Sequence, residues 1–355
     1  MKTEFNSNGS EYISGLIAEG INNGSRTAKV SGNYLITEAV RLPSDFTLIL
    51  EDCHLQVAKG HFSNIFINES LGTERAHKSD GADRNITVIG RGVAILDGGE
   101  FNGLSEHTSE RDGMPPVWNN NLILFANVDG FSISGLSCHN QGWWALNFYF
   151  CRNGYLGNLD FLASDIGVDK NGNMYHGLER ERYEEVLVKN ADGIDLRVGC
   201  QNILIENISG FTEDDTVALT GIVGKGEKNF FVDGLTTDIA NVRIRNVRSS
   251  AFCTIVRLLN QGGVRLHDID IDGVYDTSAD SPRLNRGLYA VRVGDVRLYG
   301  SRHATADETY NISIKNVYGR SDYAVSLAGD MRGLVMEGIS VGDNCQLLLD
   351  ERVSK

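Results

Sequence analysis

Two short acidic segments contain residues whose types and spacing are suited to proton transfer. Asp192 and Asp195 belong to NADGID, and Asp214 and Asp215 to TEDDTVALTG, within a stretch otherwise rich in Ile, Leu and Val. Carboxyl groups held close together raise one another's pKa, which destabilises a fold unless the charges are compensated or used. A pair of such groups can protonate a glycosidic bond on one side and activate water on the other.

The elements that would position these acids form a repeat. Segments along the chain alternate apolar and polar residues, the period-two pattern of a strand; examples are NITVIG, FSISGL, NILIENI, NVRIRNV, NISIKNV and GLVMEGI. Where no insertion intervenes, they recur about every two dozen residues. This period predicts an all-β fold, a parallel β-helix, whose successive coils stack about 4.8 Å apart. A β-propeller or β-sandwich is disfavoured because NG or DG hairpin turns between paired strands are missing.

The repeat predicts one domain over residues 1–355 with a cap and three long loops. Residues 10–24 are expected to form an N-terminal capping helix, with Ser10 as its N-cap and an end at Asn22–Gly24. Its predicted apolar stripe is Ile13, Leu16, Ile17 and Ile21. Segments 163–185, 222–238 and 276–286 exceed the repeat, and such insertions often wall a binding face.

A second strand of each coil aligns without gaps, and its equivalent positions form columns. Two inward apolar columns are Leu146, Ile194, Val217, Val256, Val291, Val325 and Phe148, Leu196, Leu219, Leu258, Val293, Leu327. The column before them reads Trp144, Asp192, Asp215, Thr254, Tyr289, Tyr323, and the outward column between them reads Asn147, Asp195, Ala218, Arg257, Arg292, Ser326.

The columns place Asp192 and Asp215 on adjacent coils with Asp214 beside them. Asp195, Arg257 and Arg292 fall on the same outward surface. A single aspartate at a strand end is often only a solvated turn residue, and Asp-Gly is a common turn dipeptide. Three acids in register beside two arginines favour a functional site.

Composition limits the partners. The net charge of −14 argues against nucleic acid and anionic membranes, although a few local arginines can still bind an anionic substrate. Six dispersed cysteines without a CxxC pair disfavour a zinc site, and we expect neither a metal nor a cofactor. The N-terminal residues lack an apolar signal core and no apolar run has membrane length, so a cytoplasmic protein is expected unless a signal peptide was removed.

The segments Asn190–Asp195 and Asp214–Asp215 resemble the NTDG(I/F)D and DD signatures of the polygalacturonases, glycoside hydrolase family 28. The resemblance implies a right-handed parallel β-helix and inverting hydrolysis of an oligosaccharide, with a pectin-like substrate that contains uronate or rhamnose. It also implies that Asp214 is the general acid and that Asp192 and Asp215 hold and activate the water. The long loops favour exo action.

Two positions depart from that family. The GHG motif of that family would fall on Cys253–Ile255, so Thr254 stands at the histidine position. The RIK motif would fall on Arg292–Gly294, so Gly294 stands at the lysine position. Arg257 is a candidate for the missing positive charge, since Arg suits carboxylate binding. A surface salt bridge from Arg257 to Asp195 or Asp215 is the alternative.

Other candidate binding residues are weaker. Trp143, Trp144 and Tyr289 could stack on sugar rings, and the alternative for the two tryptophans is that they pack over the sheet edge. Asn147 faces the same surface, and His176 could replace the missing histidine or lie on the surface. His303, Arg180 and Arg182 are further candidates.

Two other functions stay open. A β-helix lyase or epimerase would use the arginines and Tyr289 beside the acids, and a carbohydrate-binding solenoid would need no catalyst. The oligomeric state is not predicted.

Overall fold

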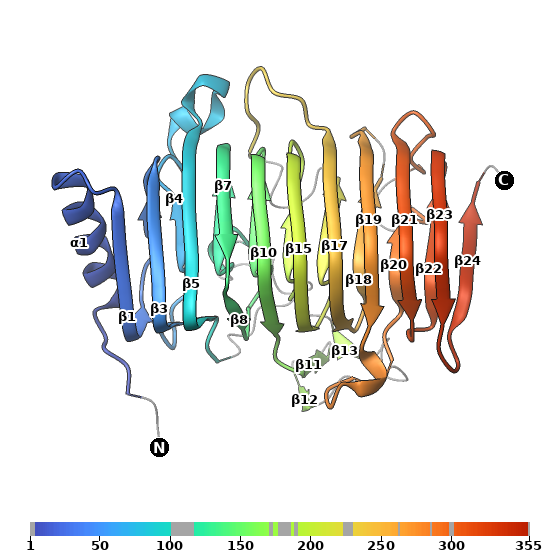
Figure 1. Cartoon of the computed structure of the whole chain (residues 1–355), viewed down its shortest axis with the longest axis horizontal. Helices are drawn as coiled ribbons and strands as arrows, with labels where there is room; N and C mark the ends of the chain where they lie inside the picture. Colours follow the sequence, from blue (N-terminus) through green and yellow to red (C-terminus); the bar gives the residue numbers. More distant parts are fainter. Residues whose placement is uncertain are drawn as a thin grey trace.

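The chain forms a right-handed parallel β-helix built from two long parallel sheets (Figure 1). The structure, a computed structural model, describes residues 4–100, 117–169, 173–176, 186–187, 191–222, 230–261, 263–284, 286–297 and 302–353. The first sheet runs in the order β1 (Thr27–Ile36), β3 (Phe46–Val57), β5 (Asp83–Asp97), β7 (Val128–Ser134), β10 (Arg152–Leu162), β15 (Gln201–Thr212), β17 (Ile239–Ala251), β19 (Leu266–Asp276), β21 (Thr309–Gly319) and β23 (Arg332–Val341), with β8 (Ser137–His139) beside β5 and β10.

The second sheet takes the other strand of each coil. Its order is β2 (Val40–Leu42), β4 (Phe66–Asn68), β6 (Ile123–Ala126), β9 (Leu146–Tyr149), β14 (Ile194–Leu196), β16 (Val217–Gly221), β18 (Thr254–Asn260), β20 (Tyr289–Val293), β22 (Tyr323–Gly329) and β24 (Gln346–Arg352). The predicted columns are confirmed: Ile194 pairs with Leu146 and Val217, and the register continues through the following coils. Both inward columns are buried between the sheets.

Asparagines bend the strands of the first sheet. Asn202 and Asn207 have φ of 56°, a left-handed conformation that Asn tolerates better than most residues. The amide of Asn202 donates to Asn153 Oδ1 at 3.2 Å, and the amide of Asn246 donates to Asn207 Oδ1 at 2.7 Å. These ladders explain the recurrent Asn in the sequence, because each coil needs the bend and the stacked amides satisfy one another.

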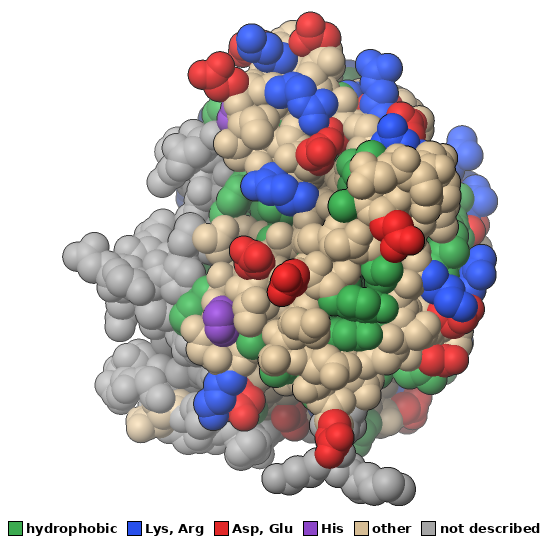
Figure 2. Space-filling model, turned by 90° about the vertical axis from the view of Figure 1, so that its left-hand side faces the viewer, with side chains coloured by type: hydrophobic (Ala, Val, Ile, Leu, Met, Phe, Trp, Pro, Cys, Tyr) green, Lys and Arg blue, Asp and Glu red, His purple; other side chains and the backbone are tan. Residues whose placement is uncertain are grey.

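Helix α1 (Gly9–Asn22) packs on β1 and β2 and closes the N-terminal end of the core. The prediction of Ser10 as N-cap is wrong: Asn8 is the N-cap, and the Ser10 hydroxyl donates to Glu38 O at 2.8 Å. Ile13 and Ile17 are buried, but Ile21 is exposed, so the apolar stripe is narrower than expected. Figure 2 shows this end of the molecule, where acidic and basic side chains are interspersed and apolar side chains form only small patches.

Connections between the sheets carry short elements of their own. Within 163–185, β11 (Ile166–Asp169) and β12 (Met174–His176) form an antiparallel sheet with β13 (Val186–Leu187). The 276–286 connection contains the 3-10 helix η6 (Ser278–Asp280), and in the 222–238 connection Phe230 and Val232 are buried. No helix in the described part of the chain is long and apolar enough to cross a membrane.

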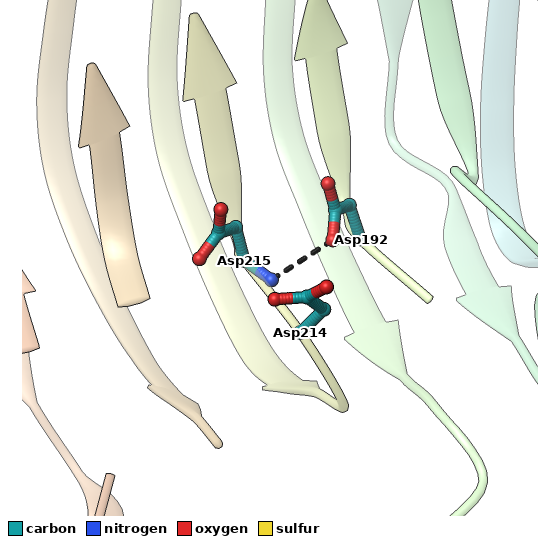
Figure 3. A group of neighbouring side chains, drawn as sticks. All are labelled: Asp192, Asp214 and Asp215. Carbon is teal, nitrogen blue, oxygen red and sulfur yellow. Dashed lines mark hydrogen bonds between the residues drawn. The ribbon is translucent and has the colours of Figure 1, made fainter. Parts of the chain in front are cut away.

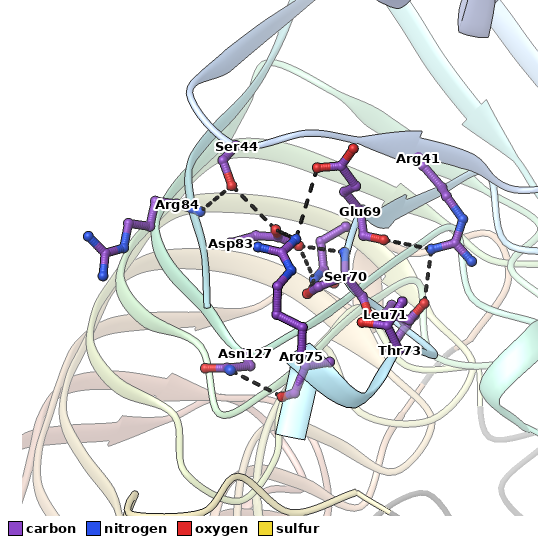
Figure 4. Close-up of polar contacts among 12 residues, drawn as sticks. Arg41, Ser44, Glu69, Ser70, Leu71, Thr73, Arg75, Asp83, Arg84 and Asn127 are labelled. Carbon is purple, nitrogen blue, oxygen red and sulfur yellow. Dashed lines mark hydrogen bonds and ion pairs between the residues drawn. The ribbon is translucent and has the colours of Figure 1, made fainter. Parts of the chain in front are cut away.

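An additional connection, between β4 and β5, was not singled out from the sequence. It contains η1 (Glu74–His77) and η2 (Ser79–Gly81). The buried carboxylate of Asp83 holds this connection in place. It accepts hydrogen bonds from Asn68 Nδ2 at 2.7 Å, Ser70 N at 2.8 Å and Arg75 Nη2 at 2.6 Å (Figure 4).

Candidate active site

Three aspartates meet where the chain enters adjacent strands of the second sheet. Asp192 precedes β14 and Asp215 precedes β16, and the Asp215 N–H donates to Asp192 Oδ1 at 2.9 Å (Figure 3). One carboxylate oxygen each of Asp192, Asp214 and Asp215 lies within 4.8 Å of the others. We call these residues the aspartate cluster. The structure therefore brings together the three acids that the columns placed side by side.

Backbone contacts between coils hold the cluster in place. The N–H of Gly193 donates to Asp215 O at 2.9 Å, and the N–H of Ala191 donates to the buried Glu213 carboxylate at 3.2 Å. A Cβ on Gly193 would lie 2.4 Å from Thr216 O. The glycine of this Asp-Gly pair therefore serves close stacking of coils rather than a turn.

Burial sets the protonation of the cluster. It raises the pKa of Asp192 well above the usual value, and the negative charges of Asp195, Asp214 and Asp215 raise it further. Burial also raises the pKa of Asp215 to about 6, while the charge of Arg257, hydrogen bonds from Thr254 and the charge of Arg292 oppose this rise. Burial and the neighbouring negative charges therefore favour the protonated form of Asp192 more than an exposed aspartate would allow.

The neighbouring Asp195 is fully buried beside a partner that the sequence reasoning missed. Burial raises the pKa of Asp195 to about 7, and the charge of Arg197 opposes this rise. Arg197 Nη1 lies 3.3 Å from Asp195 Oδ1, and its guanidinium carbon lies 4.3 Å from the centre of the Trp144 ring. The sequence contains a signal for this pair, because Arg197 follows Asp195 by two residues and such residues point to the same side of an extended chain.

Arg257 is committed to a protein partner. Its buried guanidinium donates to Gly294 O at 2.5 Å and to Asp295 Oδ2 at 2.9 Å. Asp295, which the sequence analysis did not name, is therefore a salt-bridge partner of Arg257. Arg257 still acts on the cluster through its charge.

The two departures from the resembled family have structural roles. Thr254 is buried and hydrogen-bonds to Asp215. Gly294 has φ of +81°, and a Cβ there would lie 1.8 Å from Ala328 O. A lysine cannot occupy this position without a shift of the backbone.

Arg292 lies half-buried on the same outward column as Arg257. Its guanidinium carbon lies 4.6 Å from the centre of the Tyr289 ring, and Nη2 lies 3.9 Å from Glu351. Tyr289 stacks on Tyr323 of the next coil, with ring centres 6.1 Å apart. Tyr323 belongs to the predicted column of Asp192, Asp215 and Tyr289, but the sequence does not predict it as a binding residue.

Other predicted residues lie beneath the surface or outside the described side chains. Trp144 and Trp143 are buried against each other, and Asn147 is buried with its amide donating to Asn121 Oδ1 at 3.2 Å. Both tryptophans are therefore packed inside the protein, which is the alternative to stacking on sugar rings.

Of the four candidate loop residues, the structure describes the side chain of His303 alone. The backbone of His176 pairs with Ile166 in β11, but its side chain is outside the described part, as are Arg180 and Arg182. His303 contacts the Asp295 carbonyl at 3.1 Å.

Among the described residues, the surface differs on the two sides of the aspartate cluster. Towards β9 it is closed by a second apolar cluster outside the second sheet, whose buried members include Ile67, Leu124, Trp143, Trp144, Tyr149 and Phe230. Towards β22, in contrast, half-exposed residues lie on both sides of the buried Cys253 and Thr254; they are Asp214, Asp215, Leu288, Tyr289, Asp322 and Tyr323. We call these residues the open strip.

The aspartate cluster could also hold a metal ion. Its three carboxylates are hard oxygen ligands of the kind that Ca²⁺, Mg²⁺ and Mn²⁺ prefer. It is the one such group of His, Cys, Asp or Glu side chains found among the described residues.

Solved structures similar to this chain include polysaccharide hydrolases with a parallel β-helix fold. An exopolygalacturonase from Thermotoga maritima matches with a TM-score of 0.54 and 14% identity, over 96% of this chain and 88% of that one. An iota-carrageenase bound to iota-carrageenan fragments matches with a TM-score of 0.56 and 10% identity, over 100% and 89%. An endo-xylogalacturonan hydrolase from Aspergillus tubingensis matches with a TM-score of 0.51 and 14% identity, over 96% and 91%.

These identities show a shared fold and do not show membership of glycoside hydrolase family 28. No protein-family model matches the chain, and no curated protein sequence matches it.

Proposed function

We propose that this protein is an inverting glycoside hydrolase that acts on an oligosaccharide. The observation that carries the proposal is the aspartate cluster, in which three carboxyl groups lie within 4.8 Å of one another, the pKa of Asp192 is raised well above its usual value and that of Asp215 is raised to about 6. Adjacent carboxyl groups with raised pKa values fit acid–base hydrolysis.

Exposure distinguishes the roles within the cluster. Asp214 is half-exposed and Asp192 is buried, so Asp214 is better placed to protonate the glycosidic oxygen as the bond to the anomeric carbon breaks. Asp215 and Asp192 then hold a water molecule, and Asp215 takes its proton while the oxygen adds to the anomeric carbon. Two oxygens up to about 5.6 Å apart can bond one water, so the cluster has room for it. Because the three carboxyl groups lie within 4.8 Å of one another, the titration of each depends on the others.

The open strip supports a substrate class. Arg292 lies beside it with its side chain 12% exposed and can pair with a uronate carboxylate, while Tyr289 and Tyr323 offer ring faces for a sugar such as rhamnose. A pectin-like oligosaccharide fits these contacts. Arg257 acts in this proposal by lowering the pKa of Asp215, because its guanidinium is already paired with Asp295.

A screen of oligosaccharides tests the reaction type. We expect new reducing ends without the absorbance of an unsaturated uronate, since that chromophore would identify a lyase. Asp214→Asn should lower the rate more than about a hundredfold. Asp270→Asn is a matched control because Asp270 is half-buried on the outer face of the other sheet. Full activity of Asp214→Asn would remove Asp214 from the acid role.

Two further measurements sharpen the mechanism. The cluster oxygens are closer than the span of about 6.5–9.5 Å usual between inverting carboxyl groups, so the anomer of the first product, read by NMR, decides between inversion and retention. Dialysis against EDTA should leave the rate unchanged, because the proposed steps use only the carboxyl groups of the protein. A rate that is lost in EDTA and restored by Mg²⁺ or Ca²⁺ would instead assign a metal to the cluster.

A further inference from the structure

The C-terminal end of the solenoid leaves core positions uncovered. Met336 of β23 pairs in register with Ile314, and Leu348 of β24 pairs with Val325, so both occupy the inward columns. Ile314 and Val325 are buried, whereas Met336 is 37% exposed and Leu348 is 38% exposed. The last coil therefore presents an apolar layer that all earlier coils bury against a neighbour.

The two ends of the molecule differ in this respect. Helix α1 covers the first coil, but no described residue buries the last one (Figure 1). Among the described strands β23 pairs only with β21 and β24 only with β22, so both leave a row of backbone donors and acceptors unpaired. Long exposed edges of this kind readily accept another strand.

We propose that a second copy of this chain covers the end, so that two β-helices associate end to end through β23 and β24. A two-fold contact uses the same surface on both partners, and this surface offers apolar positions and unpaired strands to an identical partner. Growth stops at two because α1 closes the opposite end. The inward-pointing Asp350 does not prevent the contact, since Arg352 Nη2 neutralises it at 2.8 Å.

The size of the end face fits a stable dimer. The ten residues of β23 span about 33 Å and the seven of β24 about 23 Å at roughly 3.3 Å per residue, and two packed sheets with their side chains are about 20 Å thick. Each copy would bury about 560 Å², or about 1,100 Å² for the pair, which exceeds the roughly 1,000 Å² expected of a specific interface.

The oligomeric state in solution tests the proposal. Light scattering or sedimentation of the full chain at about 50 μM should give twice the chain mass of 38.9 kDa. Met336→Lys and Leu348→Lys should shift the protein to the monomer. Leu347→Lys should do the same without touching the core, because Leu347 is 52% exposed on the edge strand.

Controls separate dissociation from unfolding. Val93→Lys should stay dimeric, since Val93 is 63% exposed on β5, far from this end. Hydrogen exchange across β20 and β22 should show that the variants keep the fold. A monomeric wild-type protein, a dimer that Leu347→Lys leaves intact, or open-ended larger assemblies would each overturn the proposal.

Discussion

At the scale of single residues, Thr254 is part of the charge balance of the cluster. The sequence marks it only as a departure from a histidine, but the structure shows its side chain and backbone hydrogen-bonding to Asp215. Together with Arg257 and Arg292 it keeps Asp215 ionised at neutral pH despite burial. This role was not predictable from the column alone, because it depends on a hydrogen bond between two coils.

Thr254→Val should therefore change the pH dependence of catalysis. The base must be ionised, so kcat/KM falls as pH drops through the pKa of Asp215, about 6 in the wild type. Removing the Thr254 hydroxyl removes a hydrogen bond to the ionised Asp215 carboxylate and so raises the pKa of Asp215. The acidic limb of the kcat/KM profile should then move to higher pH by roughly one unit. Thr254→Ser should leave the limb in place. An unshifted limb in the valine variant would exclude this role of Thr254.

Gly294 shows why the missing lysine cannot simply be restored. Its φ of +81° strains any other residue, and a Cβ there would overlap Ala328 O. We expect Gly294→Ala to lower stability by more than the roughly 1–2 kcal/mol of the left-handed conformation alone. Gly263 also has positive φ, 89°, but open space around it, so Gly263→Ala isolates the conformational cost. Equal losses in urea unfolding for the two variants would show that the Ala328 contact is readily relieved.

At the scale of elements, the repeating parts were predictable and the irregular parts were not. Ile194, Val217 and Val256 fell into one column because coil stacking repeats the same environment at every turn. Ser10 was misassigned because its hydroxyl bonds a distant segment, Glu38, instead of its own helix. Local capping rules do not contain that long-range partner.

The β4–β5 connection is the clearest case of an element fixed by one buried side chain (Figure 4). Although burial alone would raise it, the pKa of Asp83 is lowered by hydrogen bonds from Ser70 and Asn68 and by the charge of Arg75. The ionised carboxylate therefore stabilises the fold above the unfolded pKa of about 4, and this stabilisation is lost as pH falls through the folded pKa.

Asp83→Asn should lower the free energy of unfolding at pH 7 by about 2–4 kcal/mol, because it leaves Arg75 and a buried N–H without their charged acceptor. Urea unfolding measures this loss, which should shrink as the pH approaches 3. The control is Asp80→Asn, since Asp80 is exposed in η2. A loss that is the same at pH 3 and pH 7 would mean that the charge of Asp83 does not contribute.

At the scale of the whole molecule, the sequence predicted where the acids meet but not what surrounds them. Asp192 and Asp215 followed from the period, whereas the burial of Trp144 depends on Ile67, Leu124 and Phe230, which lie in other coils and connections. The Asp295 partner of Arg257 likewise comes from the following connection. Contacts between segments of different coils carry no periodic signal.

The difference between the two sides of the site predicts the product pattern. Coils stack about 4.8 Å apart, so the open strip from β16 to β22 spans roughly 14 Å, the length of about three sugar residues. Because the second apolar cluster occupies the opposite direction among the described residues, we expect a chain end to reach the aspartate cluster. An end-labelled oligosaccharide that proves to be a substrate should therefore lose one short unit at a time from the first minutes. An early mixture of mid-length fragments would show that the substrate passes through the closed side.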